Sequence, residues 1–250
     1  MEQGEYLEVV TRESTALADA LRAGDVNAPV PSCPGWTIAR LVKHTGTAQR
    51  WADAIVEQRS TQPVDAKSID LGLTSDVESD AHRLATWFED GAAHLTATLA
   101  DAKPDAEVWS WAGDHRVGFW SRRMAQETAV HRWDGEAARG AARAIDGELA
   151  VDGIEERFDN LPATSARRGM VMTGAGETVH LHCTDRDGEW LVRLRADGPE
   201  ITREHAKGDV AARGSASDLL LLVYGRIAPE QVDVFGDVEV LRRFQELAKL

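Results

Sequence analysis

The sequence contains few cysteines and no long apolar segment. Cys33 and Cys183 are the two cysteines among 250 residues, which is too few for a disulfide framework. No apolar run approaches the roughly 20 residues that a helix needs to span a bilayer. The segment MEQGEYLEVV also lacks the basic-then-apolar pattern of a secretory signal. These absences predict a cytoplasmic protein that does not bind or cross a membrane.

Positive charge is also scarce in this chain. There are 28 Lys and Arg residues against 42 Asp and Glu residues, and the formal net charge is -14. Sequence-independent binding to nucleic acid or anionic lipid depends on positive patches. The composition therefore argues against both partners and indicates an acidic surface that keeps the protein in solution.

Motifs of several common enzyme classes are missing. The sequence contains no Gly-rich phosphate loop, no dinucleotide fingerprint and no Ser-centred elbow. Cys33 precedes a predicted helix N-terminus, where a thiolate is favoured. No histidine stands at a spacing that indicates a catalytic dyad with it, so we interpret Cys33 as structural or incidental. The sequence therefore argues against a kinase, a dehydrogenase or a serine hydrolase.

The first 140 residues predict four helices joined by polar loops. In each helix, apolar residues recur every three or four positions, which is typical of a helix with one buried face. The loops are rich in Pro and Gly or in polar residues. Such helices favour an antiparallel four-helix bundle. The predicted helices are 5–23, 37–58, 76–99 and 119–139.

The remainder of the chain mixes helices and strands. ETVHLHCTD and EWLVRLRAD alternate with period two around a turn at 186–188, which predicts a hairpin. We therefore expect an α+β protein in which residues 1–143 form the bundle and residues 144–250 a smaller α+β domain. The other expected elements are a helix at 149–158, strands near 199–203 and 209–213, a helix from Ser215 or Ser217 to Gly225, and a final helix at 238–250.

Two ionisable residues lie on the predicted buried face of helix 119–139. Glu127 and His131 are four positions apart, so their side chains share one face. Burial of such groups is costly without a partner. His44 lies on the apolar face of helix 37–58, and the sequence therefore predicts that His44, Glu127 and His131 bind a metal ion. An ion pair between adjacent turns and a hydrogen-bonded core histidine are the alternatives.

The donor set favours zinc. Two imidazoles and one carboxylate suit Zn²⁺ with an open fourth position, as in catalytic zinc sites. Nickel and iron accept similar ligands, so another divalent metal stays open. Asp134 follows His131 by three positions and either orients its imidazole or is a solvated carboxylate at the helix end. Arg122 and Arg123 are candidates for contact with an anionic substrate, although a surface role is expected for at least one of them.

The other histidines show no comparable pattern. His180 and His182 share one face of a predicted strand, but no third partner lies near them in the sequence. We therefore interpret them as ordinary strand residues. The histidines without any pattern are His82, His94, His115 and His205.

Three segments resemble the mycothiol-dependent maleylpyruvate isomerase family. They are CPGWTIARLVKH at 33–44, RRMAQETAVHRWD at 122–134 and GSASDLLLLVYGR at 214–226. The resemblance implies a DinB-like four-helix bundle followed by a small α+β domain somewhat like a sterol carrier protein. By that likeness His44, Glu127 and His131 match the family's zinc ligands. Relatives often have a histidine before the glutamate, where this chain has Gln126.

The resemblance also implies a reaction. Zinc would hold the low-molecular-weight thiol mycothiol as a thiolate, which would add to an activated double bond of a small electrophile. Bond rotation and expulsion of the thiol would give cis–trans isomerisation, and retention of the thiol would give an S-conjugate. Arg226, in the third segment, is a candidate contact for a carboxylate of the thiol or substrate, or it simply ends a helix.

Two further functions stay open at this point. The chain could be a small-ligand-binding protein without catalytic activity, in which any metal of the bundle is structural. It could also be a hydrolase that uses metal-bound water and needs no thiol. The sequence does not indicate the oligomeric state.

Overall fold

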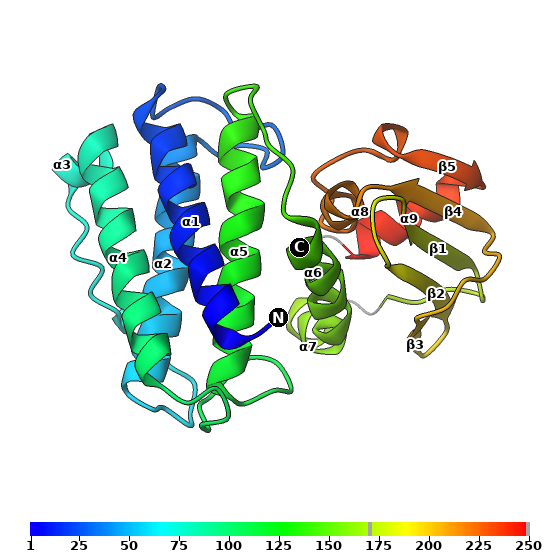
Figure 1. The fold of residues 1–250 in the computed structure, drawn as a ribbon, viewed down its shortest axis with the longest axis horizontal. Helices are drawn as coiled ribbons and strands as arrows, with labels where there is room; N and C mark the ends of the chain where they lie inside the picture. Colours follow the sequence, from blue (N-terminus) through cyan, green and yellow to red (C-terminus); the bar gives the residue numbers. More distant parts are fainter. Residues whose placement is uncertain (170–171, 249–250) are drawn as a thin grey trace. The chain divides into compact units, whose positions relative to one another are not determined.

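The computed structural model describes residues 1–169 and 172–248. It divides into two compact units, Met1–Arg143 and Ala144–Leu250. The first unit is helical, and the second combines helices with a five-stranded sheet (Figure 1). This confirms the predicted α+β class. No helix among the described residues is long and apolar enough to span a membrane.

Four long helices form the first unit. They are α1 (Gln3–Arg22), α2 (Ile38–Glu57), α4 (Ala81–Asp101) and α5 (Val117–Ala137). Thr37 is the N-cap of α2, because its side chain accepts a hydrogen bond from the Arg40 amide. The connection between α2 and α4 contains two short helical turns, η1 (Ala66–Ser68) and α3 (Ser75–Glu78).

The predicted helix 76–99 is wrong at its beginning. The structure ends α3 at Glu78 and begins α4 at Ala81. Asp80 causes the break, because its carboxylate accepts hydrogen bonds from the amides of His82 and Arg83 and so caps a new helix. A carboxylate in the middle of a continuous helix would have no such donors.

Contacts along the helices show how they run in the bundle. Gln3 of α1 donates to the Leu99 carbonyl of α4, so these two helices are antiparallel. Arg50 of α2 donates to the Trp87 carbonyl, and Asp53 contacts His94 further along both helices, so α2 and α4 are parallel. The four-helix bundle is therefore present as predicted, but this pair of helices is not antiparallel. The long connection across residues 58–80 allows this direction, because it returns along the bundle before α4 begins (Figure 1).

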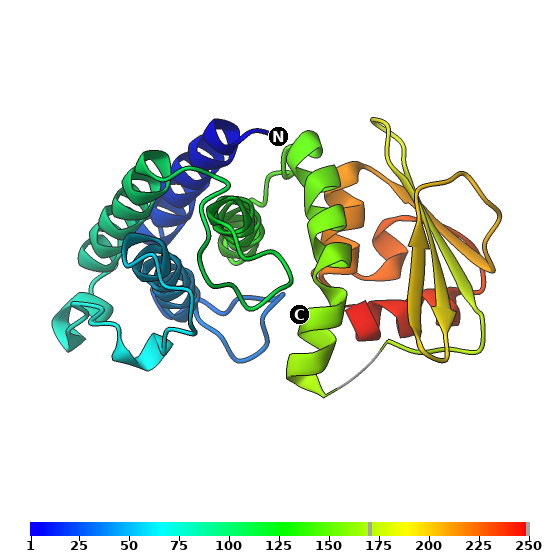
Figure 2. The same ribbon diagram turned by 90° about the horizontal axis from the view of Figure 1, so that it is seen from below.

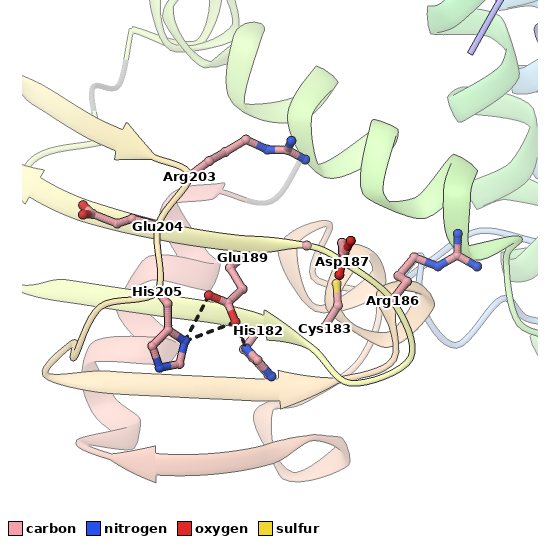
Figure 3. A pocket seen from close by; sticks show the side chains of 9 residues that line it. His182, Cys183, Arg186, Asp187, Glu189, Arg203, Glu204 and His205 are labelled. Carbon is pink, nitrogen blue, oxygen red and sulfur yellow. Dashed lines mark hydrogen bonds and ion pairs between the residues drawn. The ribbon is translucent and has the colours of Figure 1, made fainter.

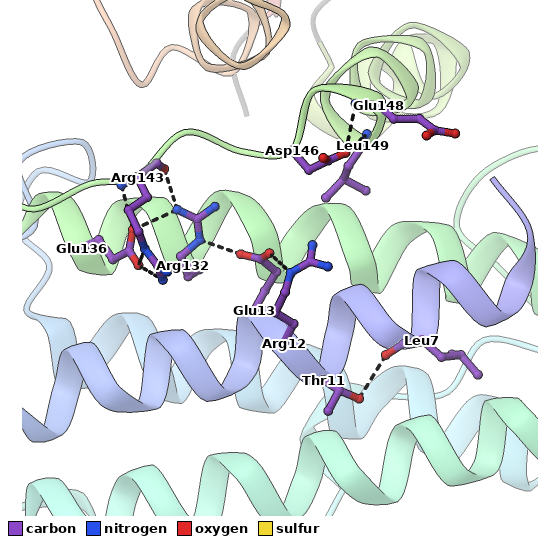
Figure 4. A network of polar contacts seen from close by, with 10 residues as sticks. All are labelled: Leu7, Thr11, Arg12, Glu13, Arg132, Glu136, Arg143, Asp146, Glu148 and Leu149. Atoms are coloured by element: carbon purple, nitrogen blue, oxygen red, sulfur yellow. Dashed lines mark hydrogen bonds and ion pairs between the residues drawn. The ribbon is translucent and has the colours of Figure 1, made fainter.

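A buried polar network joins α1 to α5 (Figure 4). Arg132 Nε donates to Glu13 Oε2 at 2.6 Å and Arg132 Nη1 donates to Glu136 Oε2 at 2.9 Å. Arg143 Nε donates to Glu136 Oε1 at 2.8 Å. Because each buried charge has a partner of opposite sign, the network holds the register of the two helices without an uncompensated charge.

The second unit is a sheet with helices on one face (Figure 2). The strand order is β3-β2-β1-β4-β5, in which β1 and β4 are parallel and the other neighbours antiparallel. The hairpin β1–β2, strands β3 and β4 and the helix that Ser215 caps confirm the predictions. The strands are β1 (Thr178–Cys183), β2 (Glu189–Arg195), β3 (Gly198–Thr202), β4 (Val210–Gly214) and β5 (Asp233–Gly236).

The helices of this unit pack in a layer on β1 and β4. Helices α8 and α9 contact both strands, and α6 packs on α8. Helix α7, the turn η2 and strand β5 were not predicted. The predicted last helix ends in the structure at Ala248, and its expected residues 249–250 lie outside the described residues. The helical elements are α6 (Gly147–Asp159), α7 (Leu161–Arg168), α8 (Ala216–Val223), η2 (Pro229–Gln231) and α9 (Val238–Ala248).

Candidate metal centre

The structure brings together the three residues that the sequence singled out in the bundle. His44 Nε2 lies 3.2 Å from Glu127 Oε1, and His131 Nε2 lies 3.2 Å from the same oxygen. One ligand atom from each of the three lies within 4.8 Å of the others. The two imidazole rings meet edge to face, with centroids 5.2 Å apart. A carboxylate oxygen and two imidazole nitrogens therefore converge on one point.

Local helix geometry and one helix pair produce this convergence. Glu127 and His131 lie one turn apart on α5, so their side chains project from the same face. His44 comes from α2, which runs antiparallel to α5. The hydrogen bond from Gln49 of α2 to Thr128 of α5 holds the two helices in register beside the cluster. The register of α2 on α5 thus decides whether a third ligand reaches the pair.

Asp134 contacts His131 through Nδ1, the ring nitrogen that does not face Glu127. Its carboxylate is fully buried, and His131 Nδ1 donates to Asp134 Oδ2 at 2.9 Å. Because a carboxylate only accepts, this contact places the proton on Nδ1 and turns Nε2 toward Glu127. Ser32 and Cys33, in the loop before α2, also contact Asp134. The alternative of a solvated carboxylate at the helix end is wrong for Asp134.

The charges at this site stabilise one another. Burial alone would raise the pKa of Glu127, but the His131, His44 and Arg123 contacts hold it well below its usual range. Burial alone would lower the pKa of His131, but Glu127 and Asp134 raise it to about 9. Arg123 is buried, and its Nη2 donates to Glu127 Oε2 at 3.2 Å. Arg123 therefore lies beside the cluster and not on the surface.

Exposure differs sharply among the three residues. The side chain of His44 is 45% exposed, that of Glu127 18% and that of His131 6%. The cluster is therefore closed on the α5 side and open to solvent on the α2 side. Trp36 packs edge-on against His44, with ring centroids 5.0 Å apart.

The donor set fits a divalent ion such as zinc. In a tetrahedral site with ligand bonds of about 2.0–2.1 Å, neighbouring ligand atoms are about 3.3 Å apart. Both nitrogen-to-oxygen distances in the cluster are 3.2 Å, close to that value. The buried Asp134 also provides the outer carboxylate that histidine ligands of metals usually have.

Arg226 lies in the second unit, just after α8. Its guanidinium Nη1 donates to the Tyr224 carbonyl at 3.0 Å, so part of its hydrogen-bonding capacity closes the helix end. Its predicted contact with a carboxylate of a ligand stays a prediction.

The interpretation of His180 and His182 as ordinary strand residues is wrong in one respect. The structure gives them partners that are distant in the sequence, because Glu189 of β2 and His205 of the β3–β4 connection lie against them. The four residues form a second group with metal-ligand spacing. Cross-strand pairing from the predicted hairpin could have revealed Glu189, but the sequence carries no signal for His205.

The fold and the bundle cluster define a class of proteins in which a helical unit with a cluster of metal-ligand type is followed by a small α+β unit. Comparison with known families agrees with this class. Residues 7–136 match the mycothiol maleylpyruvate isomerase N-terminal domain, and residues 148–243 match the MDMPI C-terminal domain. The chain belongs to the mycothiol-dependent maleylpyruvate isomerase family.

Solved structures show the same fold. The chain is similar to the crystal structure of a mycothiol-dependent maleylpyruvate isomerase, with 15% identity and a TM-score of 0.62. A mutant of a mycothiol-dependent maleylpyruvate isomerase gives 14% identity and a TM-score of 0.63. In both cases the match covers 94% of this chain and 93% of the other. No match was found among curated proteins.

Proposed function

We propose that this chain is a cytoplasmic zinc- and mycothiol-dependent enzyme that acts on a small electrophile. The reaction is cis–trans isomerisation of an unsaturated carboxylate such as maleylpyruvate, or transfer of the thiol to the electrophile. The observation that carries the proposal is the convergence of His44, Glu127 and His131 at 3.2 Å contacts in a chain of this family.

Each residue of the cluster has a distinct part in this proposal. His44, Glu127 and His131 would hold the ion, which would supply the positive charge that keeps a thiol ionised at neutral pH. With the ion bound, Asp134 would keep the one remaining proton of His131 on Nδ1, so that Nε2 would present its lone pair to the ion. Arg123 holds Glu127 in place through its second oxygen.

The exposed side of the cluster suits entry of a thiol and a substrate. His44 is the ligand that faces solvent, and it lies in the α2 segment that follows the CPGW loop. The reactive sulfur would come from mycothiol, so the proposal requires no nucleophile from the protein. We also propose that Arg226 binds a carboxylate of the thiol or substrate, in which case Arg226→Met should raise KM more than it lowers kcat.

Metal analysis of the untagged full-length protein tests the site. We expect the His131→Ala variant to contain about one zinc equivalent less than the wild type, because its ligand set is incomplete. His94→Ala is the matched control, since His94 lies in the same bundle and contacts Asp53 at 2.9 Å but lies outside the cluster. Equal zinc content in the wild type and the His131→Ala variant would exclude the proposed site.

An activity assay then separates the candidate functions. The zinc-loaded protein is mixed with maleylpyruvate, with and without mycothiol. Turnover that requires the thiol supports the proposal, and S-conjugates are distinguished from isomers by mass spectrometry. Turnover without thiol indicates a hydrolase, and binding without turnover indicates a ligand carrier.

A further inference from the structure

The second unit contains a cluster of three histidines and one glutamate that the proposed reaction does not use. Strand β1 alternates Val179 and Leu181, which are fully buried, with His180 and His182, which project from the opposite face. Glu189 of β2 is the direct cross-strand partner of His182 and shares its face. His205 lies in the connection between β3 and β4 (Figure 3).

The polar atoms of these residues converge. Glu189 contacts His182 Nδ1 through Oε1, and its Oε2 lies 3.0 Å from His205 Nδ1 and 4.0 Å from His180 Nε2. One ligand atom from each of the four residues lies within 4.8 Å of the others. The ring of His205 meets that of His180 edge to face, with centroids 5.3 Å apart. Four donors from three chain segments therefore surround one point.

His180 gives an independent indication of a missing ligand. It is 6% exposed, and its Nε2 is buried without a hydrogen-bond partner among the described residues. Such an orphaned nitrogen is costly, because desolvation is not compensated. A cation at the centre of the cluster would satisfy this nitrogen.

The cluster is accessible to an ion from solvent. His182, Glu189 and His205 line an open pocket of about 480 Å³ (Figure 3). The His205 side chain is 77% exposed, whereas those of His182 and Glu189 are 25% and 26% exposed. An ion can therefore enter past His205, and the inner ligands stay in place on the sheet.

We propose that His180, His182, Glu189 and His205 form a second binding site for a divalent transition metal of the zinc type. Three imidazole nitrogens and one carboxylate oxygen fill all four tetrahedral positions, as in zinc sites that stabilise structure and not in those that hold a reacting water. The ion would fasten the β3–β4 connection to the sheet through His205. This inference is independent of the proposed reaction at the bundle.

Zinc titration of the untagged, metal-free full chain tests the site. In a background with His131→Ala, which disables the bundle cluster, we expect one remaining zinc equivalent. Adding His205→Ala or Glu189→Gln to this background should raise the Kd for the remaining zinc by more than about 100-fold. The loss of a residue outside the first ligand sphere alone costs up to that factor in metal affinity. His82→Ala, an exposed histidine of α4, is the matched control and should leave the affinity unchanged.

The two variants keep the test informative if one of them misfolds. Glu189→Gln preserves the shape of the side chain, and circular dichroism verifies the fold of each variant. In the same His131→Ala background, Co²⁺ bound in place of zinc should give the visible absorption of a tetrahedral ion, and the added His205→Ala should abolish it. If the His131→Ala protein binds no zinc, or binds it equally well with Glu189→Gln, the four residues are a hydrogen-bonded cluster only and the proposal is wrong.

Discussion

Asp134 links His131 of the bundle cluster to the loop before α2. Its buried carboxylate accepts from His131 and is itself contacted by Ser32 and Cys33 in the loop before α2. A ligand ring held by such a carboxylate keeps its tautomer and its orientation. The position of Asp134, three residues after His131, indicated this role in the sequence, but its burial did not follow from the pattern.

The first prediction concerns this carboxylate. Asp134→Asn should lower the zinc affinity of the bundle site by about 10–100-fold, because the amide no longer fixes the proton on Nδ1 of His131. Asp53→Asn is a closely matched control, since Asp53 Oδ2 also lies 2.9 Å from a histidine Nδ1, that of His94, outside the cluster. Isothermal titration with zinc measures both. Similar losses in the two variants would show a general effect on the bundle.

The second prediction concerns Glu136 and acid. Burial alone would raise its pKa, but the hydrogen bonds from Arg143 and Arg132 lower it below the usual value. A carboxyl group with a lowered pKa in the folded state adds stability above its unfolded pKa and loses it as the pH falls through the folded pKa. Glu136→Gln should therefore cost about 1–3 kcal/mol at pH 7 and progressively less below about pH 4.

Urea unfolding followed by helical circular dichroism measures this difference at each pH. The exposed Glu8→Gln serves as the control on α1 and should change stability little throughout. A difference between the wild type and Glu136→Gln that stays constant with pH would contradict the role assigned to the carboxylate.

At the scale of the elements, the helices of the bundle approach one another closely at particular residues. Gly46 of α2 faces α4, where a Cβ atom would lie 2.5 Å from Trp87 Cζ3 and 3.1 Å from Phe88 Cδ2. These rings are buried and rigid, so they have little room to move. The close approach lets α2 lie parallel to α4 while its other side carries His44 toward α5.

The third prediction follows from this contact. Gly46→Ala should destabilise the protein by about 1–3 kcal/mol, because the added methyl overpacks the α2–α4 interface. Gly4→Ala is the control, since a Cβ at Gly4 of α1 has no neighbour within 4 Å and a helix favours alanine over glycine. Urea unfolding measures both variants. A Gly46→Ala protein as stable as Gly4→Ala would show that the interface adapts without cost.

At the scale of the whole molecule, the chain consists of two units with separate cores. The first core lies between α1, α2 and α4, where Leu17, Leu41 and Phe88 are fully buried. The second lies between the sheet and its helices, where Leu181, Leu220 and Phe244 are fully buried. Each unit therefore has the apolar core that an independent domain requires.

The fourth prediction is that residues 1–143 fold alone. The fragment should unfold cooperatively, because its helices bury their apolar faces within the unit, and it should bind one zinc ion that His131→Ala removes. Circular dichroism and zinc titration of the purified fragment measure both properties. A fragment that is unfolded, with zinc present or absent, would show that the two units depend on each other.

Local patterns in the sequence carry much of this description. Helical periodicity predicted the four long helices, and alternation predicted the β1–β2 hairpin, because both signals depend on residues a few positions apart. The Glu127–His131 pair follows from the same local rule, and its spacing places both on one face. The break before Ala81 was missed because it depends on a single capping aspartate, Asp80, and not on the apolar periodicity of the helix.

Contacts between segments that are distant in the sequence are decided by the tertiary structure. The register of α2 against α5 brings His44 to Glu127, and the β3–β4 connection brings His205 to the histidines of β1. No sequence spacing encodes these meetings, because they result from packing between elements and not from the geometry of one element. The sequence could therefore nominate His44, Glu127 and His131 from their places on buried helix faces, whereas only the folded chain shows that these donors share a centre.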